Sequence, residues 1–312
     1  MKILVIKPSS LGDIVHGLRI VHQVHEILPS VRIDWVVKNG LEDILYASGF
    51  VEKIYPFERG GGFIKFLRLI KAIRRESYDY VLDLQGLLRS ACLLKFACSK
   101  HKLGVADGRE FSTLFYKSIG EKSRKVQMHA IDRLVPFLNE LGIMNFDSSL
   151  GLNFPNSKLR EFRLDSLLKK NLILLFPESR RKEKVWPFYR DLCQSLHRDL
   201  SLNIAIGGNN HGIDFLDAID LRGRISLGEL PALINCADLV ISNDSAPLHI
   251  ASALNKPLVA LFGPTSANRY GPYPQGSNEK VIQANNGKIE SISVKNVEEA
   301  VKEVLANLGI LS

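Results

Sequence analysis

The sequence predicts an α/β protein built from two doubly wound parallel sheets. Short apolar runs of strand length alternate with helical patterns in the first half, and the same alternation restarts in the second half. The chain has 312 residues, which is long for one hydrophobic core, since domains commonly hold roughly 100–200 residues. We therefore expect two domains, residues 1–155 and residues 156–312.

The first half contains four expected strands, which are residues 1–7, 32–37, 53–57 and 78–84. Each is followed by a stretch with helical spacing, beginning with residues 14–28. A further helix is expected over Val126–Leu141, where Gly142 ends it. The segment 145–156 has weak periodicity and contains Pro155, so we place the domain boundary there.

The second half repeats this organisation. Its expected strands are residues 171–177, 202–208, 237–243 and 256–264. Its expected helices are residues 186–200, 226–236, 247–254 and 294–309. Each half therefore predicts a sheet whose strands end at a common carboxyl edge, where ligands bind in open α/β sheets.

Composition limits the functional classes. The 41 Lys and Arg residues outnumber the 33 Asp and Glu residues, and this surplus suits an anionic partner such as nucleic acid, an acidic membrane surface or a phosphorylated substrate. No apolar run approaches the roughly 20 residues of a membrane span, and Met1–Ile6 is too short for a signal peptide, so we expect a cytoplasmic protein. The four cysteines show no C-x-x-C spacing, and we expect them to be buried free thiols.

The stretch KPSSLGDIVHG places one carboxylate, Asp13, at the junction between the first strand and its helix. Gly12 lets another backbone or a ligand approach closely. Two interpretations are open: Asp13 caps the helix, which is the commoner role at such a position, or it is a working carboxylate at the ligand-binding edge.

NDSAPLHIASAL, residues 243–254, offers an anion site in the second half. Asp244 and Ser245 are good N-cap residues and Pro247 suits a first turn, so a helix begins at the carboxyl edge. Its free N–H groups favour a phosphate, which His249 could also face. The alternative is an ordinary capped helix with a half-exposed histidine.

PESRRKEKVWP, residues 177–187, gathers cations after another strand: Arg180, Arg181, Lys182 and Lys184. Such a loop suits a diphosphate, whose charge needs neutralisation when it leaves. A solvated basic loop is the alternative, although Trp186 needs a surface to pack on. The Pro/Gly-rich loop 262–274 contains Thr265 and is either a rigid site wall or a surface turn.

The helical segment 63–76 is basic and amphipathic. One face is expected to carry Phe63, Phe66, Leu67, Ile70 and Ile73, and cations occupy most of the remainder. This pattern indicates either simple solubility or contact with a membrane or a phosphorylated lipid.

The chain resembles the lipopolysaccharide heptosyltransferases of glycosyltransferase family 9, along nearly its whole length. The resemblance lies in motifs that occur in the family's order: SSLGDIVH, DWVVKNG, DLQGLLRSA, GREFSTLFY, KVWP, DLRGRISLGEL and NDSAPLHIASALNKPLVALFGPT. The early motifs are more similar to heptosyltransferase I than to heptosyltransferase II. The resemblance implies a GT-B fold, in which two Rossmann-like domains face each other across a cleft.

The resemblance also implies an activity. The resemblance, which favours heptosyltransferase I, implies transfer of heptose from ADP-L-glycero-β-D-manno-heptose, held by the second half, to Kdo of Kdo-lipid A, held by the first half. Family members invert the anomeric centre without a metal, and no other cofactor is expected. The chain contains no D-x-D pair that a divalent cation would use. The implied partners are ADP-heptose, Kdo-lipid A and the cytoplasmic face of the inner membrane, on which the protein would be peripheral, and not nucleic acid.

Site residues follow from matching motif positions. Asp13 matches the general base that deprotonates the Kdo hydroxyl, and Lys184 matches a lysine that binds donor phosphate. The remaining expected donor-binding residues are Ser179, Asp244, Ser245, Ala246 and His249. The expected acceptor-binding residues are Ser10, Gly12, Arg59, Lys65, Arg68 and Arg109. Ser245 and Ala246 stand where heptosyltransferase I often has Thr-Gly.

Three other functions compete with this prediction. The first is heptosyltransferase II, or a relative that uses another nucleotide sugar or acceptor. The second is a nicotinamide-dependent enzyme, but the first strand is followed by PSSLGD and not by G-x-G-x-x-G. The third is a non-catalytic binder of nucleic acid or membrane, which only the charge supports.

Overall fold

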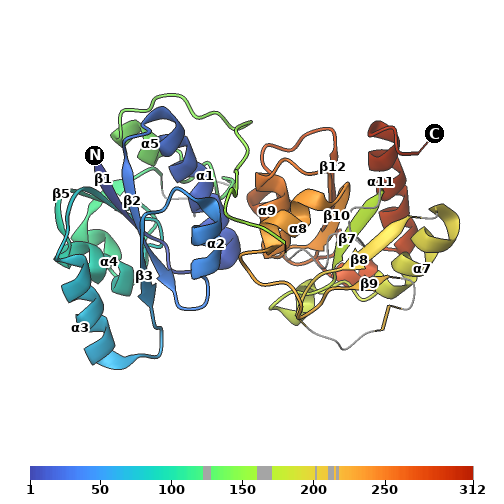
Figure 1. Ribbon diagram of the computed structural model, residues 1–312, viewed down its shortest axis with the longest axis horizontal. Coiled ribbons are helices and arrows are strands. Elements are labelled where there is room, and N and C mark those ends of the chain that lie inside the picture. The colour runs from blue at the N-terminus through green and yellow to red at the C-terminus, as the bar shows by residue number, and fades with distance from the viewer. Residues whose placement is uncertain (122–127, 160–170, 201, 210–213, 216–217, 312) are drawn as a thin grey trace. The chain divides into compact units, whose positions relative to one another are not determined.

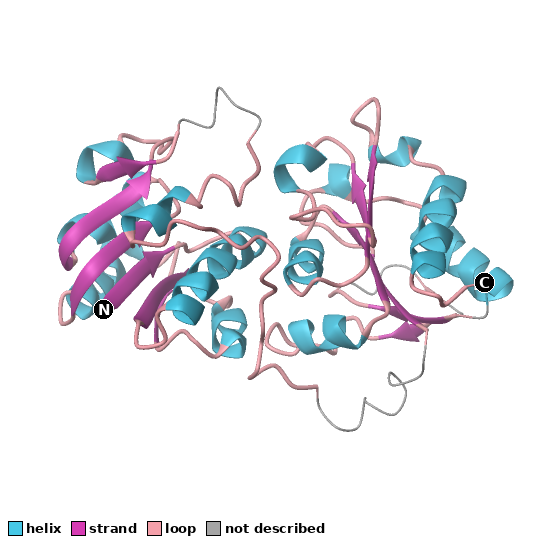
Figure 2. Ribbon diagram, turned by 90° about the horizontal axis from the view of Figure 1, so that it is seen from above, coloured by secondary structure: helices cyan, strands magenta, loops and turns pink. Residues whose placement is uncertain are grey.

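The computed structural model describes residues 1–121, 128–159, 171–200, 202–209, 214–215 and 218–311. It divides into two compact units, Met1–Asn156 and Ser157–Ser312. The boundary expected after residue 155 lies one residue from this division. Within the described ranges, each unit is organised around one six-stranded sheet with helices on both faces (Figures 1 and 2).

The sheet of the first unit has the order β3-β2-β1-β4-β5-β6, and every pairing is parallel. Its strands are β1 (Lys2–Ile6), β2 (Arg32–Lys38), β3 (Lys53–Phe57), β4 (Ser77–Asp83), β5 (Cys98–Val105) and β6 (Lys117–Ile119). Its helices are α1 (Leu11–Ile27), α2 (Glu42–Ser48), α3 (Gly62–Ile73), α4 (Leu88–Phe96), the 3₁₀ helix η1 (Ser112–Phe115) and α5 (Pro136–Glu140). Helices α1 and α2 cover one face, and α3 and α4 cover the other (Figure 1).

The apolar runs account for this arrangement. Leu4 and Ile6 of β1 are fully buried, as is Val81 of β4, because strands of a parallel sheet are covered on both faces. Ile73 of α3 and Leu94 of α4 pack into the same core cluster. Ile6 is paired with Asp83, so the carboxyl ends of β1 and β4 lie side by side.

The sheet of the second unit has the order β12-β11-β10-β7-β8-β9 and is also parallel throughout. Its strands are β7 (Leu172–Phe176), β8 (Asn203–Ile206), β9 (Ile219–Asp220), β10 (Leu239–Asn243), β11 (Leu258–Phe262) and β12 (Glu279–Gln283). Its helices are η4 (Lys182–Lys184), α7 (Tyr189–Leu200), α8 (Leu230–Cys236), α9 (Ala246–Ala253), α10 (Ala267–Tyr270), η5 (Ile289–Ser291) and α11 (Val294–Asn307). Helices α8 and α9 lie on one face, and α7 and α11 on the other (Figure 1).

The two sheets share one topology. When the strands of each unit are counted along the chain, both follow the Rossmann order 3-2-1-4-5-6. The order reverses between β1 and β4 in the first unit and between β7 and β10 in the second. Ligands of open α/β sheets bind outside the carboxyl ends of the strands at such a switch point.

The eight strands expected from the sequence are all present, whereas β5, β6, β9 and β12 were not expected. The helix expected over Val126–Leu141 is wrong. Residues 126 and 127 lie outside the described residues, 130–135 form turns, and only Pro136–Glu140 is helical. Pro136 has no N–H to continue a preceding helix, so it begins this one.

Two smaller expectations also need correction. Cys98 on β5 is exposed and Cys92 and Cys236 are partly exposed, so the expectation of buried thiols holds only for Cys193. The helix expected over residues 186–200 is α7, which begins at Tyr189 and not at Trp186. None of the helices in the described part of the chain is both long enough and apolar enough to span a membrane.

Candidate active site

The switch point of the first unit carries Asp13. The chain leaves β1 at Ile6, Ser10 becomes the N-cap of α1, and Asp13 is the third residue of the helix. Asp13 Oδ2 accepts hydrogen bonds from Ser10 N at 3.0 Å and Ser10 Oγ at 2.5 Å. Oδ1 accepts no hydrogen bond from the residues that the structure describes, and the side chain is 40% exposed. One oxygen of Asp13 therefore caps the helix while the other is available to a ligand, so the two interpretations are compatible.

A buried lysine stands behind this carboxylate. Lys7 Nζ lies 3.8 Å from Asp13 Oδ1 and donates to Leu84 O at 3.0 Å. Removal from bulk water raises the pKa of Asp13, but Lys7, the Ser10 hydrogen bonds and His16 together hold that pKa far below its usual range. Asp13 is therefore ionised at neutral pH.

A second carboxylate lies at the same switch point, and sequence reasoning missed it. Asp83 ends β4 and is fully buried. Its Oδ1 accepts from the N–H groups of Gln85 and Gly86 at 2.9 and 3.0 Å, and its Oδ2 accepts from Ser90 Oγ at 2.9 Å. Burial raises the pKa of Asp83 to about 6 against the lowering effect of these bonds. The available signal was the position of Asp83 at the start of DLQGLLRSA, directly after an apolar strand.

Of the residues expected on the acceptor side, Gly12, Arg59 and Arg109 follow the carboxyl ends of β1, β3 and β5, whereas Lys65 and Arg68 lie within α3. Gly12 is buried in the first turn of α1, and Arg109 is exposed in the loop after β5, where its N–H donates to Gly86 O at 2.8 Å. Lys65 and Arg68 are exposed on α3, and Lys65 pairs with Glu58 at 2.5 Å.

Arg59 lies in the turn before α3, and its carbonyl accepts from Arg89 Nη1 at 3.1 Å. The apolar face predicted for α3 is buried only in part: Ile70 and Ile73 are in the core, but Phe63 is 73% exposed and Leu67 is 45% exposed.

The switch point of the second unit is built by the loop after β7 and the end of β10. Asn243 is the last residue of β10 and is fully buried. Its Nδ2 donates to Pro177 O at 3.0 Å, and its Oδ1 accepts from Trp186 N at 3.2 Å and Tyr189 Oη at 3.3 Å. Trp186 is itself buried, and its Nε1 donates to Ile292 O at 2.8 Å. One amide therefore fixes both ends of the basic loop.

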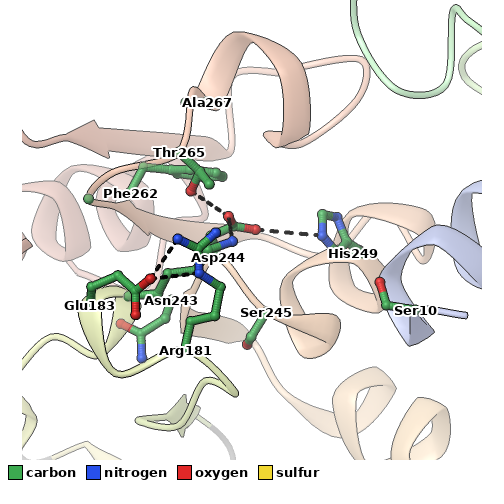
Figure 3. A network of polar contacts seen from close by, with 12 residues as sticks. Ser10, Arg181, Glu183, Asn243, Asp244, Ser245, His249, Phe262, Thr265 and Ala267 are labelled. Carbon is green, nitrogen blue, oxygen red and sulfur yellow. Dashed lines mark hydrogen bonds and ion pairs between the residues drawn. The ribbon is translucent and has the colours of Figure 1, made fainter. Parts of the chain in front are cut away.

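Asp244 follows Asn243 and is the centre of a polar network (Figure 3). Its Oδ2 accepts from Lys184 Nζ at 2.5 Å and from Thr265 Oγ1 at 2.5 Å. Its Oδ1 lies 3.8 Å from His249 Nε2. Asp244, His249 and Lys184 are largely buried, with side chains 6%, 9% and 14% exposed. The structure therefore brings together three residues expected to bind the donor and adds Thr265 from the loop after β11.

The other expected donor-binding residues lie around this network. Ser245 is the N-cap of α9 and its Oγ is 3.3 Å from Ser242 Oγ, while Ala246 is the first helical residue. Ser179 is half-buried in the loop after β7 and makes no side-chain hydrogen bond to other described residues. Arg181 pairs with Glu183 at 2.6 Å and not with the Asp244 network.

The chemistry available at these two sites is distinct. The first unit presents an ionised carboxylate whose Oδ1 lies 3.8 Å from Lys7 Nζ and accepts no hydrogen bond within the described part of the chain, so this oxygen can accept a proton. The second presents a lysine, a histidine and the N-terminus of an eight-residue helix, which together can neutralise an anion. In the described ranges of the chain, no group of three or more His, Cys, Asp or Glu side chains is arranged to hold a metal ion.

Comparison with known proteins gives consistent results. The model of glycosyltransferase family 9 (heptosyltransferase) matches residues 66–302. Lipopolysaccharide heptosyltransferase 1 of Escherichia coli strain K12 is 27% identical over 337 residues, which cover 99% of this chain and 100% of that protein.

Solved structures resemble the chain as a whole. The E. coli heptosyltransferase WaaC with ADP has a TM-score of 0.79 at 24% identity, covering 97% of this chain and 100% of that one. The structure of E. coli ADP-heptose lps heptosyltransferase II has a TM-score of 0.78 at 23% identity, covering 99% and 100%. At these identities the likeness shows the fold, and the expectation of a GT-B protein with two parallel-sheet α/β domains is confirmed.

Proposed function

The chain belongs to glycosyltransferase family 9, the heptosyltransferases, and from this premise we propose that it transfers heptose from ADP-heptose to the inner core of lipopolysaccharide. In its specific form the proposal is heptosyltransferase I: the donor is ADP-L-glycero-β-D-manno-heptose and the acceptor is Kdo of Kdo-lipid A. The observation that supports it best is the Lys184–Asp244–Thr265 network at the switch point of the second unit. A diphosphate would find a cation, a hydroxyl and a helix N-terminus there.

In the proposed mechanism, Asp13 acts as the general base. The acceptor hydroxyl attacks the anomeric carbon while its proton passes to Asp13 Oδ1, and the bond from that carbon to the diphosphate oxygen breaks on the opposite face. The product is inverted and ADP departs with the bonding electrons. Asp13 suits this role because Ser10 occupies only Oδ2, and no metal is required in this scheme.

Lys184 and His249 would stabilise the departing diphosphate. Both lie beside Asp244, and in this proposal Asp244 holds these two groups in position for the diphosphate. Preorganised groups of this kind stabilise charge in the transition state without reorganisation at the moment of reaction. The N–H groups of the first turn of α9, after Ser245, add to the same site.

The test is ADP release by the purified protein with ADP-heptose and Kdo-lipid A in excess EDTA. Asp13→Ala should lose roughly 10²-fold or more in turnover, because general base catalysis is typically worth 10²–10⁴-fold, and it should still bind donor. Asp43→Ala, an exposed carboxylate on α2, is the matched control and should keep full activity. Near-normal turnover by Asp13→Ala would refute the role of Asp13 as general base. Loss of turnover in EDTA would refute a metal-independent reaction.

The alternative within the family is heptosyltransferase II or a relative with another donor or acceptor. Identities of 27% to the heptosyltransferase 1 sequence and 23% to the heptosyltransferase II structure are too close to separate the two. Turnover with Kdo-lipid A, compared with turnover on the singly heptosylated acceptor, distinguishes them directly.

The proposal includes peripheral binding to the cytoplasmic face of the inner membrane, because the proposed acceptor is lipid-anchored. An apolar face is exposed at the carboxyl edge of the first unit, formed by Phe63, Ile64 and Leu67 of α3, Leu88 of α4, and Phe111 and Leu114 around η1. Phe111 and Leu114 are 81% and 78% exposed. Large solvent-exposed apolar patches commonly mark interaction surfaces.

Hydrogen bonds join the segments of the apolar face: Arg89 Nη1 donates to Arg59 O, and Leu88 N donates to Glu110 Oε2. The cations on the same segments are Arg59, Lys65, Arg68, Arg89 and Arg109, which suit an anionic bilayer. Phe111 has a φ of 61°, a left-handed conformation that is unfavourable for a bulky residue and holds its ring outward at a local energetic cost.

Vesicle sedimentation tests this surface. The double variant Phe63→Ser/Phe111→Ser should bind vesicles of phosphatidylglycerol at least tenfold more weakly, since burying one such side chain is worth about 1.5–3 kcal/mol. Met144→Ser, which changes a side chain that is 76% exposed but outside the apolar face, is the control. Equal binding by the double variant and the control would eliminate this face, and equal binding of the native chain to phosphatidylcholine would eliminate the charge contribution.

A further inference from the structure

Lys7 is a buried charge that the proposed mechanism does not use. The residue is 6% exposed, and lysine is almost never fully buried unless its ammonium is paired, because desolvation of the charge is unfavourable. Its Nζ donates to Leu84 O at 3.0 Å and stands 3.8 Å from Asp13 Oδ1. The fold therefore retains an energetically unfavourable cation at the one place where the candidate base is presented.

The backbone of Lys7 is fixed. Lys7 N donates to Val36 O at 3.3 Å, and Lys7 O accepts from Trp35 Nε1 at 3.2 Å. Trp35 is fully buried, so this end of β1 is held against β2. The side chain extends toward the residue after β4, where its Nζ donates to Leu84 O. The ammonium therefore has little freedom to move away from Asp13.

Four other charged or titratable groups belong to this environment. Asp83 of β4, Asp107 after β5 and Arg133 act electrostatically on Lys7, and His16 acts on Asp13 from α1. Asp107 is bound by Arg133 through Nε and Nη2 at 2.9 and 2.5 Å, and Asp83 is held by two backbone N–H groups and Ser90. Asp13 Oδ1 is thus the carboxylate oxygen near Lys7 that remains available to a substrate.

We propose that Lys7 is a positioning residue for Asp13: its ammonium, held by Leu84 O and 3.8 Å from Oδ1, fixes the orientation in which Asp13 presents that oxygen to the acceptor. This inference rests on the proposed function of Asp13 as the general base. Ser10 fixes Oδ2 through the helix cap and Lys7 attracts Oδ1 from behind, so the two contacts together set the plane of the carboxylate. Without Lys7, the nearest cation would no longer oppose the effect of desolvation on Asp13. The pKa of Asp13 would rise, which favours the protonated and inactive acid.

The first test is the pH dependence of kcat for Lys7→Met, which keeps the length of the side chain and removes its charge. The native enzyme should show no acid limb attributable to Asp13 above pH 5, since the pKa of Asp13 is held far below its usual range. Lys7→Met should show an acid limb above pH 5, because desolvation, the largest influence on the pKa of Asp13, then acts without the opposing charge of Lys7; the KM for the donor should be unchanged. Lys7→Arg should restore most of the native profile. A loss that is equal at every pH would mean a merely structural role and would overturn the inference.

The second test does not depend on turnover, so it separates failure of this inference from failure of the proposed function. The carboxyl of Asp13 is titrated by carbon-13 NMR in the native chain and in Lys7→Met, with Asp13→Asn identifying its resonance. A midpoint at least one pH unit higher in Lys7→Met supports the inference, and an unchanged midpoint refutes it. Lys38→Met, a half-exposed lysine at the end of β2, should leave the midpoint unchanged. If Lys7→Met does not fold, Lys7→Gln carries the same comparison, because its amide can still donate to Leu84 O.

Discussion

Replacement of Asn243 by alanine should destabilise the second unit and weaken nucleotide binding together. The Asn243 side chain joins residues distant in sequence, since it bonds Pro177 at one end of the basic loop and Trp186 and Tyr189 at the other. The side chain is fully buried. Alanine would remove all three hydrogen bonds and leave their partners inside the protein.

The magnitude follows from the groups left unpaired. Pro177 O and Trp186 N–H are peptide groups, and each buried polar group without a partner costs about 1–3 kcal/mol. The two groups together would lower the free energy of unfolding by about 2–6 kcal/mol. Water that enters the space left by the amide can bond one of them, so we expect a loss of about 3 kcal/mol. Asn285→Ala, an exposed asparagine without a side-chain hydrogen bond in the described residues, should change the free energy of unfolding by less than about 0.5 kcal/mol.

The assay is urea unfolding of the full chain followed by tryptophan fluorescence. The chain has two tryptophans, one in each unit, so the background variant Trp35→Phe leaves Trp186 as the reporter of the second unit. The same samples give ADP affinity, which should fall because Lys184 lies on the loop that Asn243 anchors. An unfolding free energy for Asn243→Ala within about 0.5 kcal/mol of its background would refute the anchoring argument.

Three further outcomes are expected. Lys184→Met should weaken ADP binding about tenfold or more, because a charged hydrogen bond is worth about 1.5–3 kcal/mol, whereas exposed Lys182→Met should have little effect in the same titration calorimetry. The pKa of Asp83 is raised from 3.8 to about 6, so its contribution to stability is present below the unfolded pKa and is lost as pH rises through about 6. The melting temperature of Asp83→Asn should therefore rise relative to that of the native chain between pH 4.5 and 7, and a difference in melting temperature that does not change with pH would contradict this. Tyr78→Phe should lower the free energy of unfolding in urea by about 1–3 kcal/mol, because the fully buried Asp34 carboxylate loses the Tyr78 hydroxyl that donates to it at 2.8 Å. An unchanged urea midpoint would show that another donor replaces this hydroxyl.

Local sequence signals predicted much of this fold. Runs such as residues 172–176 are apolar without alternation, and a strand buried on both faces requires that pattern. Ser10 and Asp13 stand at the spacing of a capping box, so the start of α1 was encoded within four residues. The motif residues Lys184, Asp244 and His249 were also expected at one site, because the carboxyl ends of parallel strands share an edge.

The sequence missed features for which local pattern was insufficient. The helix over Val126–Leu141 had apolar residues at helical spacing, but Pro136 and the turns before it limit the helix to five residues. The short edge strands β6 and β9 contain three and two residues, too few to show a period. Exposure of Phe63 and Leu67 also escaped prediction, because amphipathic spacing alone does not say how far a helix face is covered.

The sequence by itself determined the alternating α/β elements, the helix caps and the residue types that point to a nucleotide-sugar transferase. Only the tertiary structure placed Asp83 and Lys7 close to Asp13. It also brought Asn243 between the two ends of the basic loop, where it bonds Trp186, a residue 57 positions away in the sequence. The physical reason is that strand order is fixed by contacts between segments far apart in the chain. Burial, pairing and the electrostatic environment of a charge depend on those contacts and leave no trace in the spacing of neighbouring residues.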